Sequence, residues 1–349
     1  MSKVRIVAAV PLSDHLAESI TAVDPCIELA YEPSFFPQER YIGDHHGTPQ
    51  HNRSDADQHR FEDLIDTAEV LYGVPDGKPT QLGRTVRANS RLRWVNMQMA
   101  GGGSQVARCG FDQSDLDRVT FTTSAGVHAQ MLAEFAILGI FAGAKRLWSL
   151  QADQNVHRWP THRTPTRSVR DATLLIIGLG EIGKATAAAA AALGMRVIGT
   201  KRRVEDIAYV DAVFTNEHLA QIIGEADHIV ITLPGTPQTD RLVDEALLAR
   251  AKPGVNIINV GRGTVIDEPA LVAALKSAQV GSAALDVFAA EPLPKDSPLW
   301  DMPQVIISPH SSALDDKEEE RVVDLFIRNL RSYLVGDALI NKVHPELGY

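Results

Sequence analysis

The chain has 349 residues, 44% of them hydrophobic and 22% charged, and this length suits two globular domains with ordinary cores. Its formal net charge of −10 argues against a nucleic-acid or membrane-surface partner, because either would favour a basic face. With only Cys26 and Cys109, no signal-peptide pattern and no apolar run long enough to span a bilayer, we expect no disulfide framework and a cytoplasmic location.

The N-terminal part of the chain alternates short apolar runs with helical patterns. This alternation predicts a small parallel α/β unit. Its elements are strands at 4–10, 27–30, 69–72 and 93–97 and a helix at 13–20.

A polar stretch at 32–60 interrupts this unit and is longer than most loops. One interpretation is a metal site; the other, which we favour because the spacings match no known ligand pattern, is a solvated insertion without metal. The candidate ligands are His45, His46, His51, His59, Asp44, Asp55 and Asp57.

A glycine-rich segment, Met99 to Ser104, follows the strand at 93–97. One interpretation is a flexible surface turn. The other is an anion site, because glycines expose backbone N–H groups at the carboxyl end of a parallel strand, where α/β proteins bind ligands. The residues alone leave both open. Beyond it we expect one long helix at 129–150 and a loop at 151–170.

The strongest motif is Gly178-Leu179-Gly180-Glu181-Ile182-Gly183. An apolar strand at 173–177 precedes it, and an alanine-rich helix and a strand at 195–199 follow, which is the context of a dinucleotide-binding fingerprint. Gly178 permits the tight turn, Gly180 lets the backbone approach a pyrophosphate, and Gly183 lets the helix pack on the strand. The helix N-terminus, at Glu181 and Ile182, offers N–H groups to the anion.

The second strand of this unit ends in Lys201-Arg202-Arg203, with no acid before Glu205. Proteins that prefer NAD usually carry an acid here for the ribose 2′-hydroxyl. Three cations can instead bind a 2′-phosphate, arginine by a bidentate fork. An ordinary basic surface loop is the alternative, but the position favours NADPH over NADH.

The strand pattern continues at 227–233, 255–260, 283–287 and 305–308, and a helix is expected at 315–335. This helix opens with an acidic run from Asp315 to Glu320. We interpret the run as a first turn that suits the helix dipole and as a solvated face.

Residues with catalytic potential follow three of these strands. Arg262 is a candidate for binding the carboxylate of a 2-keto acid and polarising its carbonyl, because a guanidinium binds two oxygens in a fixed plane. Imidazole titrates near working pH, so His310 suits the proton donor. Glu291, hydrogen-bonded to that imidazole, would orient it and keep its acid form available. Each residue alone has an ordinary surface interpretation, but their positions at consecutive strand ends favour a catalytic site.

At these residues the chain resembles the D-isomer-specific 2-hydroxyacid dehydrogenases, from about residue 94 to 312. The resemblance implies a Rossmann-type dinucleotide-binding domain (126–312) inserted into a smaller flavodoxin-like α/β substrate domain (1–125 and 313–349), a cleft between them, and a homodimer built on the first. The matching motifs are Ala133-Glu134, the glycine fingerprint, Leu233-Pro234, Thr236, Thr239, Asn259, Arg262-Gly263, Asp267-Glu268, Leu285 to Phe288, Glu291-Pro292-Leu293 and Pro309-His310.

The resemblance also implies roles for individual residues. Arg262 would bind the substrate carboxylate and carbonyl, and His310 would be the acid/base with Glu291 as its partner. Backbone N–H groups at Ala100, Gly101 and Gly102 would hold the carboxylate, and Asp286 would lie near the nicotinamide carboxamide. Further cofactor contacts are expected at Leu233, Pro234, Thr239, Val260, Gly261 and Ser312. Gly261 stands where the family often has Ala or Cys, which we interpret as a minor change.

We therefore expect NADPH-dependent reduction of a small 2-keto acid to the D-2-hydroxy acid. Glyoxylate and hydroxypyruvate are the substrates that the resemblance suggests, but no residue reads out the substrate side chain. A nucleotide-sensing, corepressor-like binding protein on the same fold is the alternative, since fold alone does not fix function. The presence of Arg262, Glu291 and His310 disfavours it. Formate dehydrogenase fits less well, because that branch resembles Gln where Glu291 stands.

Overall fold

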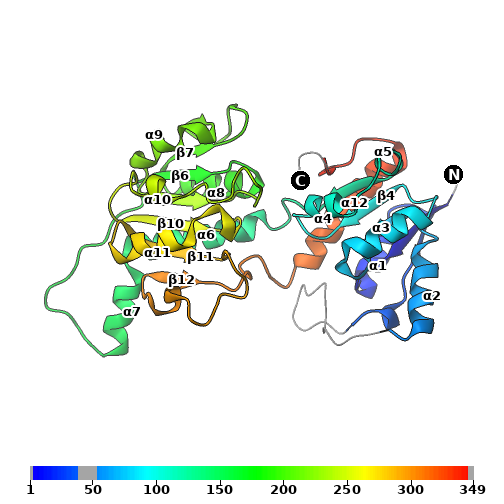
Figure 1. Cartoon of the computed structure of the whole chain (residues 1–349), viewed down its shortest axis with the longest axis horizontal. Helices are drawn as coiled ribbons and strands as arrows, with labels where there is room; N and C mark the ends of the chain where they lie inside the picture. The colour runs from blue at the N-terminus through cyan, green and yellow to red at the C-terminus, as the bar shows by residue number, and fades with distance from the viewer. Residues whose placement is uncertain (1–2, 38–52, 345–349) are drawn as a thin grey trace. The chain divides into compact units, whose positions relative to one another are not determined.

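The computed structural model describes residues 3–37 and 53–344. The chain forms two compact units, each with its own parallel sheet. Unit 1 consists of Met1–Val127 and Leu314–Tyr349, and unit 2 consists of His128–Ala313. Figure 1 shows the first and last segments of the chain in one unit and the middle of the chain in the other. Within the described ranges, no helix combines the length and apolar character needed to cross a membrane.

Unit 1 has a five-stranded sheet in the order β2-β1-β3-β4-β5, which is the flavodoxin-like order. Successive residues of β1 point to opposite faces, Ile6 toward α1 and α12 and Val7 toward α2 and α3. The strands are β1 Val4–Ala8, β2 Ile27–Ala30, β3 Val70–Tyr72, β4 Trp94–Met97 and β5 Thr120–Thr123. The helices are α1 Asp14–Thr21, α2 Asp55–Ile65, α3 Pro79–Ala88, α4 Gly103–Arg108, α5 Gln113–Arg118 and α12 Glu318–Val335.

Helix α2 corrects the interpretation of 32–60 as a solvated insertion. Ser54 caps this helix, its hydroxyl accepting a hydrogen bond from the Asp57 backbone N–H at 3.1 Å, and Phe61 and Ile65 are buried. One apolar stripe on an otherwise polar helix therefore anchors the segment from residue 54 onward. The candidate ligands Asp44, His45, His46 and His51 lie outside the described residues. Among those described, no three His, Cys, Asp or Glu side chains gather where they could hold a metal.

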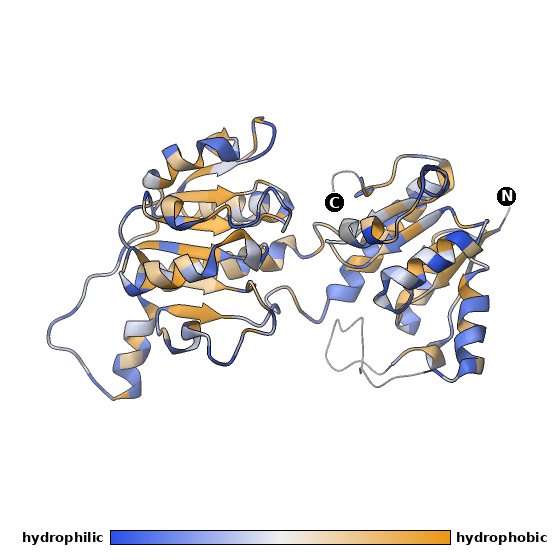
Figure 2. Cartoon of the chain, in the orientation of Figure 1, coloured by the Kyte–Doolittle hydropathy of each residue, from blue (hydrophilic) through white to orange (hydrophobic). Residues whose placement is uncertain are grey.

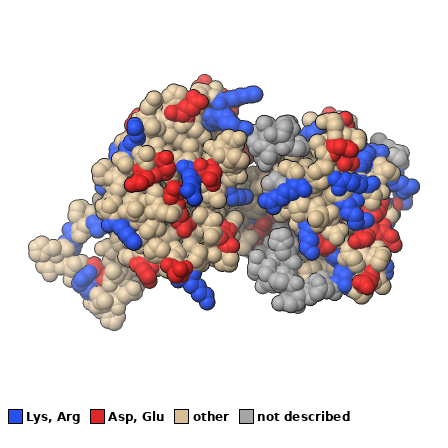
Figure 3. All heavy atoms as spheres, in the orientation of Figure 1, with Lys and Arg blue, Asp and Glu red and all other residues tan. Residues whose placement is uncertain are grey.

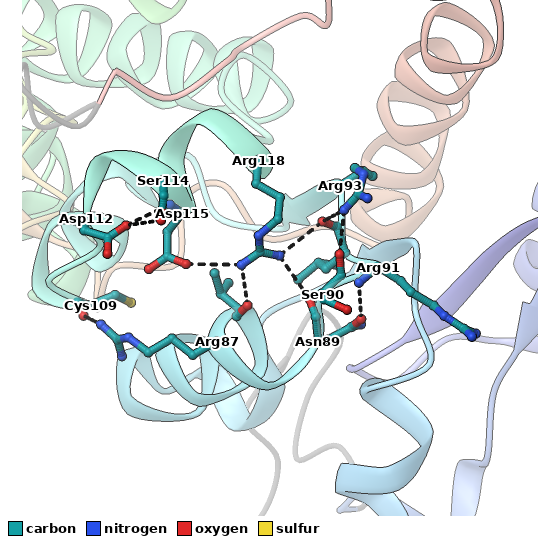
Figure 4. A network of polar contacts seen from close by, with 12 residues as sticks. Arg87, Asn89, Ser90, Arg91, Arg93, Cys109, Asp112, Ser114, Asp115 and Arg118 are labelled. Atoms are coloured by element: carbon teal, nitrogen blue, oxygen red, sulfur yellow. Dashed lines mark hydrogen bonds and ion pairs between the residues drawn. The ribbon is translucent and has the colours of Figure 1, made fainter.

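Arg118 holds the end of α3 in place (Figure 4). Its guanidinium donates to the backbone oxygens of Val86 at 2.6 Å and Asn89 at 3.0 Å, and it pairs with Asp115 at 3.1 Å. The last carbonyls of a helix have no partner within the helix, so a cation here satisfies them and suits the dipole. This fixes the chain as it enters β4, the strand that precedes the glycine-rich segment.

Helix α12 begins at Glu318 rather than at 315, and its first turn differs from the expected solvated face. Asp315 pairs with Arg321 ahead of the helix, and Glu318 is only 4% exposed. The apolar side of α12 packs on β4, where Trp94 stacks on Phe326 with ring centroids 4.9 Å apart. Because this docking draws the first turn against the sheet, part of the acidic run is buried.

Unit 2 has a seven-stranded sheet in the order β12-β11-β10-β9-β6-β7-β8. The strand order reverses between β6 and β9, and ligands of such sheets bind at the carboxyl ends beside this point. Its strands are largely apolar (Figure 2). The strands are β6 Thr173–Ile177, β7 Arg196–Thr200, β8 Ala212–Phe214, β9 His228–Ile231, β10 Val255–Asn259, β11 Val280–Leu285 and β12 Val305–Ile307. The helices are α6 Ala129–Lys145, α7 Leu147–Asn155, α8 Glu181–Ala192, α9 Leu219–Ile222, α10 Glu245–Leu248 and α11 Glu268–Lys276.

The long helix expected at 129–150 is wrong, because the structure has two helices there. Arg146 adopts a left-handed conformation (φ 53°) that ends α6, and α7 then extends to Asn155, into the segment expected as a loop. The two helices meet different surroundings. Helix α6 packs closely on β10, where a Cβ at Gly139 would lie 2.8 Å from Ile258, whereas α7 has no buried residue.

A row of polar side chains crosses the core of unit 2 from β9 to β11. Asn256 donates from Nδ2 to the Gly139 oxygen at 2.9 Å and faces His228 Nδ1 at 3.2 Å, and its Oδ1 accepts from Ser282 at 2.8 Å. Since Asn256 offers N–H groups, His228 Nδ1 must accept, which requires the neutral imidazole. Burial lowers the pKa of His228 from 6.5 to about 4.

This histidine predicts acid sensitivity. In the unfolded chain His228 binds a proton below about pH 6.5, whereas in the folded chain it binds one only below about pH 4. The free energy of unfolding is therefore fully retained above this pH window and falls as the pH drops through it. The loss reaches up to about 3 kcal/mol. Urea unfolding from pH 7.5 to 4 should show a shallower decline for His228→Gln than for the wild type. His15→Gln, at an exposed histidine, is the control and should match the wild type; equal slopes for all three proteins would refute this account.

Candidate active site

The glycine motif forms a cradle at the carboxyl end of β6. Gly178 has φ +109°, which L side chains rarely adopt, and a Cβ at Gly183 would collide with the Gly178 carbonyl oxygen. Gly180 caps α8 and has open space around it. The first N–H groups of a helix, here at Glu181 and Ile182, have no partner within the helix. This backbone fits a pyrophosphate, as the sequence predicts.

The cations Lys201, Arg202 and Arg203 follow β7 directly. Leu179 in the glycine turn donates its backbone N–H to the Thr200 oxygen at 2.8 Å, so this strand end adjoins the cradle. Lys201 forms an ion pair with Glu205, and this hydrogen bond and charge lower the pKa of the Glu205 carboxyl. One carboxylate, that of Glu205, therefore lies among the cations predicted to bind the 2′-phosphate.

The segment after β9 closes on itself and lies against the cradle. The Thr239 hydroxyl donates to the Pro234 oxygen at 2.6 Å and accepts from the Thr236 backbone N–H at 2.9 Å. A Cβ at Gly178 would lie 2.9 Å from the Leu233 side chain. Leu233, Pro234 and Thr239, three of the expected cofactor contacts, are thus fixed beside the glycine turn.

Arg262 follows β10 in a turn that Asn259 organises. Asn259 accepts from the Gly261 N–H at 3.0 Å and donates to the Arg262 oxygen at 3.1 Å. A Cβ at Gly261 would lie 2.5 Å from the Leu233 backbone oxygen, so Ala or Cys would require the backbone to move. The interpretation of Gly261 as a minor change is therefore wrong. Val260 is buried, whereas Arg262 is exposed.

The structure brings His310 and Glu291 together. His310 Nδ1 lies 2.8 Å from Glu291 Oε2, and Glu291 Oε1 accepts from the Phe288 backbone N–H at 3.0 Å. The carboxylate is thus held at both oxygens, and the proton of the neutral imidazole is assigned to Nδ1. His310 is half exposed, so Nε2 is left as the ring nitrogen available to a ligand. A protonated imidazole can therefore release the proton at Nε2, while the hydrogen bond to Glu291 holds the other proton at Nδ1.

Asp286 anchors the loop that carries His310, a role that the sequence did not suggest. Its Oδ1 accepts from the Ser308 hydroxyl at 2.5 Å and from the backbone N–H groups of Ser311 and Ser312 at 3.0 Å each. His310 itself has φ 54° and donates its backbone N–H to the backbone oxygen of Asp286 at 3.0 Å. An acid directly after a buried apolar strand was the available signal.

A second carboxylate that the sequence reasoning left without a role supports the same region. Glu268, at the start of α11, accepts from the Ala289 backbone N–H at 3.1 Å. It therefore fixes the segment between Asp286 and Glu291. A Cβ at Gly263 would collide with the backbone of Phe288, so only glycine fits where residue 263 contacts this segment.

The predicted catalytic and substrate-binding residues are divided between the two units. Arg262, Asp286 and His310 follow neighbouring parallel strands β10, β11 and β12, whose carboxyl ends lie at one edge of the sheet. Within the described structure, Arg262 forms no hydrogen bond or ion pair with His310 or Glu291; its Nη1 donates to the Gly261 oxygen at 2.7 Å. Ala100, Gly101 and Gly102 belong to unit 1, between β4 and α4. Both interpretations of that segment stay open.

Comparisons with known proteins point to one family. The family model of the D-isomer specific 2-hydroxyacid dehydrogenase NAD binding domain matches residues 137–312. D-3-phosphoglycerate dehydrogenase from Mycobacterium leprae is 32% identical over 83% of the chain, but the match covers 55% of that protein, so the chain spans about half its length. Glyoxylate/hydroxypyruvate reductase B from Yersinia enterocolitica is 31% identical over 68% of the chain and 76% of that protein. A D-isomer specific 2-hydroxyacid dehydrogenase from Xanthobacter autotrophicus Py2, solved with NADPH and MES, has a TM-score of 0.76 at 27% identity over all of both chains.

Proposed function

The chain belongs to the D-isomer-specific 2-hydroxyacid dehydrogenases, and on this premise we propose that it reduces a small 2-keto acid to the D-2-hydroxy acid with NADPH. The observation that carries the proposal is the 2.8 Å contact between His310 Nδ1 and Glu291 Oε2 beside the carboxyl ends of β11 and β12. A nucleotide sensor would need neither a proton donor nor its carboxylate partner. The relatives are named as enzymes, which does not favour that alternative.

The proposed reaction divides its tasks among three side chains. NADPH, held by the cradle in unit 2, would supply the hydride for the keto carbon. Arg262 holds the substrate carboxylate and the carbonyl oxygen in one plane, which withdraws electrons from the keto carbon. His310 donates the Nε2 proton to that oxygen, and Glu291 keeps the second proton at Nδ1 and holds the ring in place. The products are the hydroxy acid and a neutral imidazole.

Two backbone regions would hold the ligands. In unit 1, N–H groups of Ala100, Gly101 and Gly102 would bind the substrate carboxylate. In unit 2, the cradle and the neighbouring strand ends would hold the cofactor; these residues are Gly178, Gly180, Glu181, Ile182, Gly183, Leu233, Pro234, Thr239, Val260, Gly261, Asp286 and Ser312. Turnover of NADPH with a panel of 2-keto acids, headed by glyoxylate and hydroxypyruvate, tests the proposal. Binding of NADPH without oxidation by any acid of the panel would contradict it and favour a sensor.

The preference for NADPH rests on Lys201, Arg202 and Arg203. The solved relative from Xanthobacter autotrophicus binds NADPH, which supports the same choice here. Arg202→Ala should lower kcat/KM for NADPH by about ten-fold or more, because a charge-assisted hydrogen bond to phosphate is lost, and should leave NADH unaffected. Initial rates with both cofactors check this. A wild-type preference for NADH would remove the idea.

We also propose that the protein is a homodimer and that the arm, residues 146–166, forms part of the contact. The arm extends from the rest of unit 2 (Figure 1), and much of its outermost surface is uncharged (Figure 3). Its apolar side chains are unusually open, with Val156 67% and Trp159 86% exposed. A hollow of about 1100 Å³ at the arm has a mixed lining, in which Trp159 lies among polar residues, the cations Lys145, Arg146, Arg158 and Arg163, and Asp153, the ion-pair partner of Arg158. Exposed apolar side chains of this kind are typical of a protein contact, and we propose a second copy of the chain as the partner that covers them.

Replacing both Val156 and Trp159 with serine should raise the dimer dissociation constant by about thirty-fold or more, since a buried tryptophan anchor contributes strongly to such contacts. Light scattering after size exclusion, over a dilution series, measures the change. Trp300→Ser is the matched control, because Trp300 is 52% exposed in unit 2 but lies outside the arm. A wild-type monomer, or an equal effect of Trp300→Ser and of the double substitution in the arm, would contradict the assignment of the arm.

A further inference from the structure

The cations that follow β7 are not equally available to a ligand. Lys201 is fixed at its backbone, whose N–H donates to the Phe214 oxygen in β8 at 2.8 Å. Its ammonium forms an ion pair with Glu205 four residues on, and the two side chains are 29% and 55% exposed. The resting partner of Lys201 is therefore a carboxylate of its own loop.

The neighbouring charges follow a similar pattern. Lys184 in α8 pairs with Glu181 at 2.9 Å, so a second lysine beside the cradle also has its own carboxylate. Arg203, by contrast, makes no hydrogen bond or ion pair with any residue that the structure describes, although its charge acts on Glu205. Lys201, Lys184 and Arg203 together keep the pKa of the Glu205 carboxyl below its usual range, so this carboxylate is ionised at neutral pH.

We propose that Glu205 reduces the preference for NADPH over NADH, by competing with the 2′-phosphate for Lys201. The inference rests on the proposed function, which places the adenosine end of the cofactor at the end of β7. A 2′-phosphate that approaches Lys201 must displace Glu205 or accept its repulsion, whereas a 2′-hydroxyl meets no such penalty. Glu205 thus weakens the binding of the phosphorylated cofactor selectively, and the preference for NADPH that is left comes from the arginines.

The size of the effect follows from the exposure of the pair. Charges a few ångströms apart at a solvated surface interact weakly, and an exposed ion pair contributes little. Removing the Glu205 charge should therefore tighten the binding of a 2′-phosphorylated ligand by about five-fold. The affinity for a ligand without this phosphate should stay the same.

The test uses calorimetric titration of the full chain with 2′,5′-ADP and with 5′-AMP. Glu205→Gln should bind 2′,5′-ADP about five-fold more tightly than the wild type and bind 5′-AMP equally well. Asp206→Asn is the matched control, since it removes the same charge from the adjacent exposed residue that has no ion pair to Lys201. It should change the 2′,5′-ADP affinity by less than about two-fold. Unchanged binding in Glu205→Gln, equal gains for both ligands, or an equal effect of Asp206→Asn would overturn the inference.

A double-mutant cycle separates competition for Lys201 from simple repulsion. In a Lys201→Ala background, Glu205→Gln should gain much less than it does in the wild type, because the partner for which both anions compete is gone. An equal gain in both backgrounds would overturn the competition. These titrations require no turnover, so the inference survives if no keto acid is reduced, whereas failure of the wild type to bind either nucleotide would end both proposals.

Discussion

Replacing His310 with alanine is expected to lower kcat for keto-acid reduction by about 10²- to 10⁴-fold, the usual contribution of a positioned general acid. The side chain is half exposed and its polar partner in the structure is Glu291, so the fold should be unaffected. Steady-state rates at saturating substrate measure the change, and titration with NADPH checks that cofactor binding is retained.

Glu291→Gln is the informative companion to this variant. The amide oxygen of glutamine can still accept from the imidazole at Nδ1, but it no longer stabilises the charged ring. Its kcat should therefore fall by less than that of His310→Ala. Near-normal turnover of His310→Ala would contradict the assignment of the proton donor.

Replacing Arg262 with alanine is expected to lower kcat/KM by about 10²- to 10⁴-fold, because two charge-assisted hydrogen bonds to the substrate are lost at roughly 1.5–3 kcal/mol each. Initial rates at low keto-acid concentration measure this. Arg262→Lys should recover only part of the loss, since an ammonium keeps the charge but cannot bind two oxygens in one plane.

The control for Arg262 is Arg250→Ala, an exposed arginine after α10 that lies outside the candidate site. It should leave kcat/KM unchanged and so exclude a general effect of surface charge. If Arg262→Ala retained the wild-type kcat/KM, the substrate would have to be held by other groups.

The sequence predicted those elements whose local signals are strong. Strands β6, β9 and β10 are completely buried and are rich in isoleucine, leucine and valine, and the glycine motif defined the turn between β6 and α8. The sequence did not predict the three-residue strand β8 or the threonine-rich strand β5, because β8 is only partly buried and β5 contains a single strongly apolar residue. Both exist through their pairing with a neighbouring strand, which no local pattern reveals.

The candidate site shows the same division. The contact between His310 and Glu291 was expected from strand ends that follow one another in a parallel sheet, and the structure contains it, while the catalytic roles stay predictions. The three groups that donate hydrogen bonds to Asp286 belong to residues 22 to 26 positions further along the chain, and no pattern near Asp286 in the sequence predicts them. The ion pair that occupies Lys201 was missed because Glu205 was read only as an acid too distant for the ribose.

A crystal structure of the chain with NADP⁺ and oxamate, an unreactive analogue of glyoxylate, tests the central claim most directly. We expect His310 Nε2 within hydrogen-bond distance of the oxamate carbonyl oxygen, Glu291 still bound at Nδ1, and the Arg262 guanidinium on the analogue's oxygens. An imidazole directed away from the analogue, or a carboxylate held without Arg262, would contradict it.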